Sequence, residues 1–126
     1  MSIKIKYSES SSFMEVTYTG TIRSNEFYDA FFVLNLLMNK KGINMYLADC
    51  LKLKSGYYIP DMIELINTMN EIKEIRTMKG AIIQPLDSAA VKDVKFFEDA
   101  CVNRGFNVKI FDTREKAVSW LTEKRK

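Results

Sequence analysis

The chain begins with two short stretches in which apolar and polar residues alternate. Ile3, Ile5 and Tyr7 are separated by Lys4 and Lys6, and the same period returns over residues 13–19 after a serine-rich stretch. A period of two places successive side chains on opposite faces of a β-strand. The pattern therefore predicts an N-terminal β-hairpin whose second strand ends at Gly20.

Four later stretches change to a helical period, with apolar residues at every third or fourth position. The residues expected to begin these helices are Ser24, Pro60, Asp87 or Ser88, and Asp112 or Thr113, and Glu115 is placed to complete a capping box with Asp112. The predicted buried stripes are Phe27, Phe31, Leu34 and Met38; Met62, Leu65, Ile66, Met69 and Ile72; Val91, Val94, Phe97 and Cys101; and Ala117, Trp120 and Leu121. Gly42 and Gly105 follow the first and third of these helices, as C-terminal glycines do.

Short apolar runs between the helices predict three more strands, at residues 44–49, 80–84 and 107–111. The resulting order, β-β-α-β-α-β-α-β-α, favours an α/β fold with a mainly parallel five-stranded sheet and an N-terminal antiparallel hairpin. No linker or change of composition interrupts the chain, so residues 1–126 are expected to form a single domain.

The composition indicates a compact globular protein, because 47% of the 126 residues are hydrophobic and 28% are charged. The net charge of +3 comes from basic residues scattered along the chain, with a short basic run at 124–126 that is typical of a solvated end. This distribution predicts no nucleic-acid partner. No apolar run approaches the roughly 20 residues of a membrane span, and the N-terminus lacks the apolar core of a signal peptide. We therefore expect a cytoplasmic protein.

The residue types exclude several chemistries. The chain has no histidine, which removes Ser-His-Asp and Cys-His nucleophilic pairs and most catalytic zinc sites. Cys50 and Cys101 are far apart and form no C-x-x-C motif, so neither a redox pair nor a cysteine zinc site is indicated. The sequence predicts no metal, no cofactor and no enzymatic activity. A small enzyme that uses Cys50 and Asp49 is the weakest alternative, because no base is placed to activate the thiol.

Several segments resemble the SpoIIAA-like branch of the STAS superfamily, which includes anti-sigma-factor antagonists and domains grouped with Sec14-like proteins. The segments are Gly20-Thr21-Ile22, Tyr46-Leu47-Ala48-Asp49, Gly80-Ala81-Ile82-Ile83, and Val108-Lys109-Ile110-Phe111-Asp112 followed by Glu115, Ala117, Trp120 and Leu121. None of them is a catalytic motif. The resemblance implies parallel strands stacked in sequential order with helices against the sheet, and a role in binding rather than catalysis.

The antagonists of that superfamily carry a phosphorylated serine at the start of the helix after the middle strand. Ser55-Gly56 is the nearest match in this chain, although Lys54 replaces the acidic neighbour of the family pattern and the loop is shorter. The resemblance thus implies a degenerate phospho-switch at Ser55. The alternative interpretation is that Ser55 and Gly56 form an ordinary turn.

Parallel strands end at one edge of a sheet, and ligands of open α/β sheets bind there. The residues that we expect to form such a binding rim are Asp49, Cys50, Ser55, Gly56, Tyr57, Tyr58 and Gln84. Asp49 has a simpler alternative role, which is to accept a hydrogen bond from nearby backbone, and Cys50 can be a small packing residue. Asp87, Ser88, Asp112 and Thr113 are interpreted as helix caps.

The first helix carries more apolar residues than one contact with a sheet requires. We expect a homodimer built on this helix or on the Tyr57-Tyr58 loop, and the candidate face on the helix is Phe31, Phe32, Leu36 and Leu37. The alternative is a helix buried between the sheet and its neighbours. Two functional hypotheses follow. The first is a binding module that acts through a protein partner or self-association, and the second is a carrier of a small apolar ligand or lipid held between the first two helices.

Overall fold

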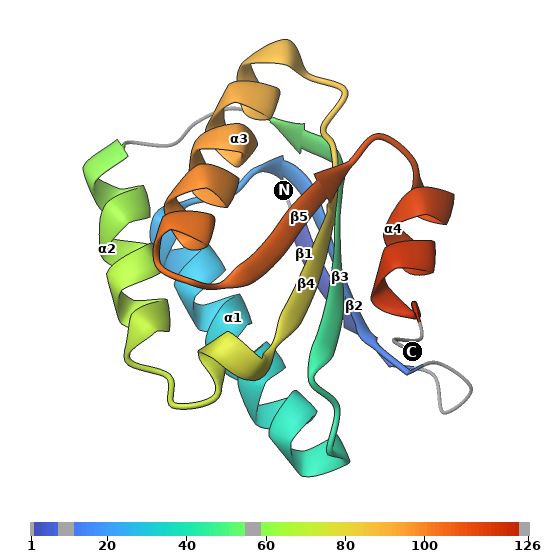
Figure 1. Cartoon of the computed structure of the whole chain (residues 1–126). Coiled ribbons are helices and arrows are strands. Elements are labelled where there is room, and N and C mark those ends of the chain that lie inside the picture. The colour runs from blue at the N-terminus through green and yellow to red at the C-terminus, as the bar shows by residue number, and fades with distance from the viewer. Residues whose placement is uncertain (1, 8–11, 55–58, 124–126) are drawn as a thin grey trace.

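A computed structural model of the chain describes residues 2–7, 12–54 and 59–123 (Figure 1). The strands are β1 (Ser2–Lys6), β2 (Met14–Thr21), β3 (Met45–Lys54), β4 (Lys79–Ile83) and β5 (Asn107–Phe111). The helices are α1 (Ser24–Lys41), α2 (Ile59–Asn70), α3 (Ser88–Asn103) and α4 (Arg114–Leu121), with a short 3-10 turn at Ile75–Thr77. The predicted order of elements is confirmed.

The sheet has the strand order β1-β2-β3-β4-β5. β1 runs antiparallel to β2, with Ile3 opposite Tyr18, while β2, β3, β4 and β5 are parallel to one another. In the parallel part, Tyr46 of β3 lies opposite Gly80 of β4, and Gly80 lies opposite Val108 of β5. The predicted α/β fold, with an antiparallel hairpin followed by parallel strands, is confirmed.

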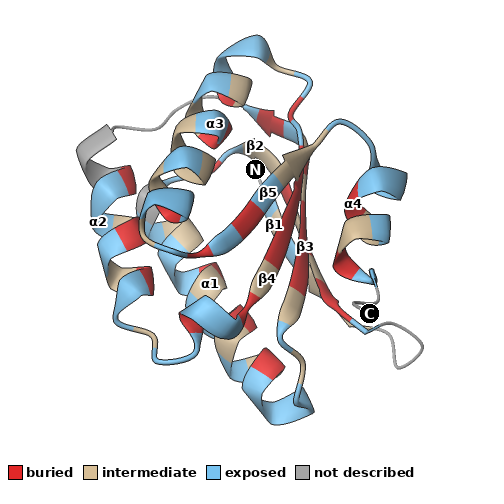
Figure 2. Ribbon diagram, in the orientation of Figure 1, coloured by how far each residue is buried: buried red, intermediate tan, exposed pale blue. Residues whose placement is uncertain are grey.

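Helices cover both faces of the sheet, and they are unequally divided between them. α1, α2 and α3 lie on one face and α4 lies on the other (Figure 1). Neighbouring residues of β3 divide accordingly: Tyr46 and Ala48 belong to the larger core cluster under α1, α2 and α3, whereas Leu47 packs with Ala117 and Leu121 of α4. Figure 2 shows the resulting buried residues along the central strands. β3 is therefore buried on both faces, as its continuous apolar run predicts.

Two helices begin at predicted caps. The Asp87 carboxylate accepts a hydrogen bond from the Ala90 backbone N–H at 3.2 Å, and the Thr113 hydroxyl accepts one from Lys116 N–H at 3.2 Å. The predicted capping box between Asp112 and Glu115 is wrong, because Thr113 is the cap and Asp112 instead pairs with the Lys116 ammonium at 3.2 Å.

The start of α1 also differs from the prediction. Ser24 is the first helical residue, and Arg23 occupies the N-cap position. The Glu26 carboxylate accepts a hydrogen bond from the Arg23 backbone N–H at 3.0 Å. The side chain of the third helical residue, Glu26, thus stabilises the start of α1. Its carboxylate accepts a hydrogen bond from a backbone N–H and interacts favourably with the helix dipole.

β3 is longer than predicted, because it continues past Asp49 to Lys54. Thr17 of β2 pairs with Asp49 but Thr19 pairs with Lys52, so β3 contains one extra residue between these pairs. The Asp49 carboxylate accepts a hydrogen bond from the Leu51 backbone N–H at 3.1 Å. A bulge leaves backbone groups without ladder partners, and Asp49 compensates for one of them. The alternative that Asp49 bonds to nearby backbone is confirmed.

Candidate functional site

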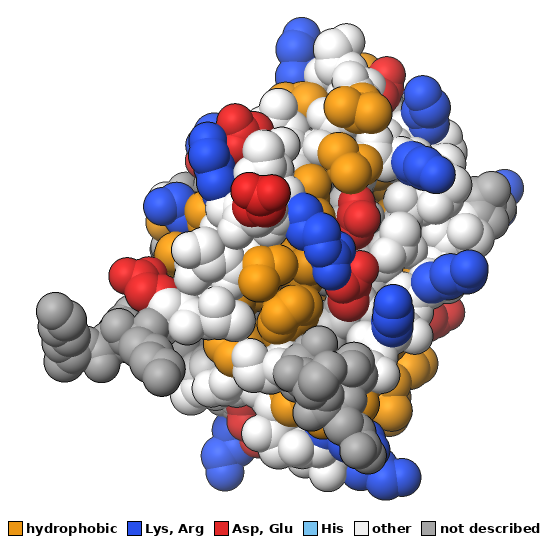
Figure 3. Space-filling model, turned by 90° about the vertical axis from the view of Figure 1, so that its right-hand side faces the viewer, with side chains coloured by type: hydrophobic (Ala, Val, Ile, Leu, Met, Phe, Trp, Pro, Cys, Tyr) orange, Lys and Arg blue, Asp and Glu red, His pale blue; other side chains and the backbone are white. Residues whose placement is uncertain are grey.

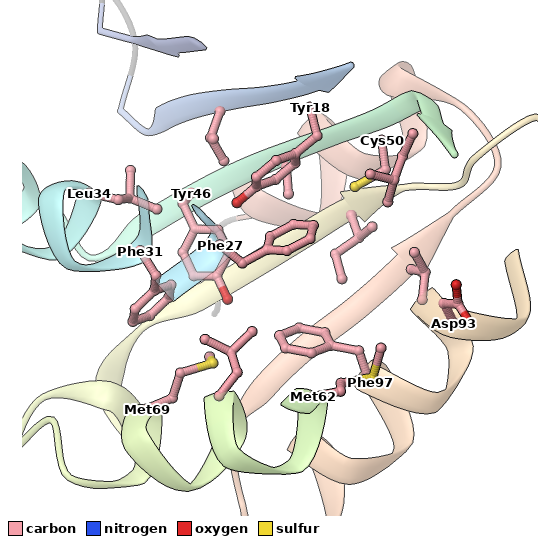
Figure 4. Close-up of a pocket in the computed structure, with 16 residues that line it drawn as sticks. Tyr18, Phe27, Phe31, Leu34, Tyr46, Cys50, Met62, Met69, Asp93 and Phe97 are labelled. Carbon is pink, nitrogen blue, oxygen red and sulfur yellow. The ribbon is translucent and has the colours of Figure 1, made fainter. Parts of the chain in front are cut away.

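The larger core cluster encloses a cavity of about 90 Å³ between the sheet and three helices (Figure 4). Its sheet side includes Val16, Tyr18, Tyr46, Ala48, Cys50 and Ile82, and its helix side includes Phe27, Phe31, Leu34, Met62, Leu65, Met69, Asp93, Val94 and Phe97. Protein interiors contain few voids much larger than a water molecule. A cavity of this size is therefore the first candidate for a binding site.

Aromatic pairs shape two sides of the cavity. The rings of Tyr18 and Phe27 lie 4.7 Å apart between centroids at an interplanar angle of 44°, and those of Phe31 and Tyr46 meet edge to face at 6.2 Å. Each pair joins a strand to α1, so the rings hold that helix against the sheet while leaving space beyond them. The sequence pattern identified Phe27 and Phe31 as buried residues, but it did not reveal the cavity.

Three polar groups on the sheet side of the cavity, those of Tyr18, Tyr46 and Cys50, are weak acids in an apolar environment. Burial raises the pKa of Tyr18, and the nearby Cys50 and Tyr46 raise it further. Burial likewise raises the pKa of Tyr46 and of the Cys50 thiol, with the Asp49 carboxylate adding to the effect at Cys50. These groups therefore stay neutral at pH 7 and can take part in hydrogen bonds without carrying charge.

We expect neither cysteine to react as an activated thiol in the folded protein. Cys50 is 5% exposed and Cys101 is fully buried, and burial raises the pKa of Cys101 to about 12. Since the thiolate is the reacting form, modification by a disulfide reagent at pH 8 should be at least about 100-fold slower than that of free cysteine. Absorbance of the released thiol measures the rate, and urea-unfolded protein is the control. A native rate close to that of free cysteine would contradict the expectation.

The structure describes three residues of the predicted binding rim, Asp49, Cys50 and Gln84, and Asp49 lies opposite Ile83, the residue before Gln84. Asp49 and Cys50 are neighbours within β3, and they lie on opposite faces of the sheet. Cys50 lines the cavity, whereas the Asp49 carboxylate acts electrostatically on Arg114 of α4. Gln84 is exposed just after β4. The proposed pair of Asp49 and Cys50 in one active site is wrong for this geometric reason, and the remaining rim residues, Ser55, Gly56, Tyr57 and Tyr58, lie outside the described residues.

The predicted dimer face divides into two halves. Phe31 and Leu37 are half-buried and pack against the core. Phe32 and Leu36 are each 54% exposed, and Tyr28 and Val33 on the same helix are also exposed. We call Tyr28, Phe32, Val33 and Leu36 the α1 stripe. The sequence pattern missed Tyr28 and Val33, because a helix that is apolar around most of its circumference does not show which side meets the core.

The side of the molecule that carries α4 has a different surface. Figure 3 shows hydrophobic side chains there set among basic and acidic side chains. The Arg114 guanidinium pairs with the Glu15 carboxylate, which raises the pKa of Arg114, and the Lys79 ammonium lies 4.4 Å from the centre of the Trp120 ring. Such mixed charges are typical of a solvated face.

The described residues contain no group of three or more Cys, Asp or Glu side chains arranged to hold a metal ion. In the same part of the chain, no helix has both the length and the apolar character needed to cross a bilayer.

Comparison with solved structures identifies the fold. An uncharacterised DUF3478-family protein with a SpoIIAA-like fold from Shewanella loihica PV-4 superposes with a TM-score of 0.57 at 21% identity, covering 95% of this chain and 92% of that protein. The anti-sigma factor antagonist SpoIIAA in its unphosphorylated form superposes with a TM-score of 0.61 at 9% identity, covering 98% and 100%. No protein-family model matches the sequence, and no curated protein matches it either. The chain therefore has a SpoIIAA-like fold, as its sequence resemblance implies.

Proposed function

We propose that this chain, built on a SpoIIAA-like fold, is a non-enzymatic binding module that acts through protein contacts made by α1, with a second copy of itself as the partner. The observation that carries the proposal is the α1 stripe. Four large side chains, Tyr28, Phe32, Val33 and Leu36, are exposed along one helix. A contiguous apolar surface of this kind marks an interaction site in a soluble protein, because its exposure to water is unfavourable.

Charge complementarity favours a second copy as the partner. Asp29, Val33, Leu36 and Lys40 follow one another at helical spacing, and Asp29 and Lys40 are exposed. When two α1 helices pair antiparallel about a two-fold axis, Val33 of each copy faces Leu36 of the other, and Asp29 faces Lys40. The antiparallel arrangement also places the basic last turn of each helix beside the acidic first half of the other, which the helix dipoles favour. An apolar centre with charged ends is the usual anatomy of an interface.

Charge reversal tests this arrangement. Asp29→Lys should weaken self-association by about 1–2 kcal/mol, or about five- to thirtyfold in Kd, because it places like charges together at both ends of a symmetric interface. The double variant Asp29→Lys/Lys40→Glu should recover most of the loss. Sedimentation equilibrium at low salt measures both dissociation constants.

The matched control is Glu71→Lys, a charge reversal at an exposed residue outside α1 that should leave Kd unchanged. If the double variant associates no better than Asp29→Lys, the antiparallel pairing is incorrect. If the unaltered chain sediments as a monomer at high micromolar concentration, self-association itself is refuted.

A carrier of a small apolar ligand is the second candidate function, and a separate observation favours it. The cavity under α1, α2 and α3 is lined almost entirely by apolar and aromatic side chains. Its volume of about 90 Å³ suits a small molecule better than the acyl chain of a lipid. The two roles are compatible, because the α1 stripe faces solvent while the cavity lies on the core side of the same helix.

A further inference from the structure

The cavity has an opening toward the surface as well as an apolar interior. Phe27 of α1, Leu65 of α2, and Asp93 and Phe97 of α3 all line it, and all four are only partly buried. α2 packs against both α1 and α3, and Met62 and Met69 project from it into the cavity (Figure 4). Methionine side chains adapt their shape readily, so a ligand can enter between these helices without disrupting the sheet.

The lining restricts the charge of a ligand. Among the described residues that line the cavity there is no lysine or arginine, and the one carboxylate in that set, Asp93, is on α3 at the edge. A carboxylate or phosphate ligand would lose its hydration and find no cation in exchange. The lining therefore excludes anions, fatty acids among them, and favours an uncharged molecule.

The lining also supplies hydrogen-bonding groups at specific places. The hydroxyl group of Tyr46 lies over Gly80 of β4, and that of Tyr18 points along the sheet toward Tyr46, so both groups lie on the sheet side of the cavity (Figure 4). A tyrosine hydroxyl can donate one hydrogen bond and accept another, so it can pair with a hydroxyl or carbonyl group of a ligand. In a mostly apolar binding site, a small number of polar groups fixes the orientation of the bound molecule.

The volume limits the size of the ligand. About 90 Å³ is well above the ~10–15 Å³ needed for one water and below the ~150 Å³ of an engineered cavity that binds benzene. A single ring therefore requires Met62 and Met69 to adjust, and a larger molecule requires a larger displacement of the lining.

From these observations we infer that the cavity binds a small, uncharged, single-ring molecule with one hydroxyl or carbonyl group, which hydrogen-bonds to Tyr18 or Tyr46. This inference rests on the second candidate function and specifies the chemical class of its ligand. It is independent of self-association through the α1 stripe.

Methionine methyl groups provide the test. In protein labelled with ¹³C at the methionine methyls, phenol and benzene should each cause saturable chemical-shift changes of Met62 and Met69. Met45, which packs in the other core cluster, is the internal control and should not respond. Phenol should bind about five- to tenfold more tightly than benzene because of its hydrogen bond. Hexanoate, an anionic probe, should cause no saturable change.

Variants separate binding in the cavity from binding elsewhere. Tyr18→Phe/Tyr46→Phe should abolish the advantage of phenol while benzene still binds, and Ala48→Leu should block both probes by filling the space. Val118→Leu, beside the other cluster, is the control for added volume, and circular dichroism confirms that each variant is folded.

The outcomes distinguish the class of ligand from the carrier function. If hexanoate binds and phenol does not, the cavity still binds a ligand but the inferred class is wrong. If no probe shifts Met62 or Met69 at ~10 mM, or if the shifts persist in folded Ala48→Leu, both the inference and the carrier function fail. If Ala48→Leu unfolds, the test rests on Tyr18→Phe/Tyr46→Phe. If phenol still binds that variant more tightly than benzene by the same factor, the inference is overturned.

Discussion

Phe32→Glu is expected to convert a dimer of this chain into a folded monomer. Phe32 is 54% exposed at the middle of the α1 stripe, so its ring contributes little to the monomer core. In the proposed dimer, the new carboxylate would be buried without a cation. An unpaired charge in an interface costs about 3–5 kcal/mol, which corresponds to more than about a hundredfold in Kd. Sedimentation equilibrium measures the association, and circular dichroism measures the fold.

Val102→Glu is the matched control, because Val102 on α3 is also 54% exposed and lies outside the stripe. This variant should remain as dimeric and as folded as the unaltered chain. Two results would count against the dimer proposal. One is a dimer that survives Phe32→Glu, and the other is a Phe32→Glu variant that unfolds, which would place Phe32 in the monomer core.

Gly80→Ala should lower the free energy of unfolding by about 2–3 kcal/mol, although it adds only one methyl group to a strand. Gly80 lies opposite Tyr46 in the register of β3 and β4. A Cβ at this position would overlap the Tyr46 ring, with Cε2 only 2.6 Å away. Because Tyr46 is buried and its ring meets Phe31 edge to face, moving the ring disrupts that contact. Urea denaturation followed by circular dichroism measures the change.

A double-mutant cycle identifies the cause of this loss. In a Tyr46→Ala background the ring is absent, so Gly80→Ala should cost less than about 0.5 kcal/mol, and the difference measures the steric conflict. Gly42→Ala provides a contrast: Gly42 has a φ of +69° and open space around its Cβ position. Its cost, about 1 kcal/mol, arises from the backbone and should be the same in both backgrounds. Equal costs for Gly80→Ala with and without Tyr46 would refute the steric explanation.

The fold is the part of this protein that its sequence predicts well. The period of two near Ile3 and Ile5, and the return of apolar residues at helical spacing after Asp87 and Thr113, are local properties of the chain. Local hydrogen bonds confirm both helix starts. The order of strands and helices then leaves few ways to build a sheet, because crossovers between parallel strands are right-handed and short.

The candidate site is predicted less well, because it depends on contacts between distant segments. The residues that line the cavity come from three strands and three helices, and no local pattern shows that their side chains leave space between them. The bulge in β3 is similarly hidden. It depends on a change of register against β2. Because of it, β3 continues beyond Asp49, where the sequence pattern predicted that the strand ends.

The sequence by itself determined the class of fold, the order and approximate limits of its elements, and the chemistry that the chain cannot perform without histidine. Only the tertiary structure decided which side of α1 faces solvent, since Phe31 and Phe32 are equally apolar and differ only in what surrounds them. It also separated Asp49 from Cys50 and placed Tyr18 beside Tyr46. Periodicity and residue type are properties of short segments, whereas packing, burial and cavities arise from where several segments meet.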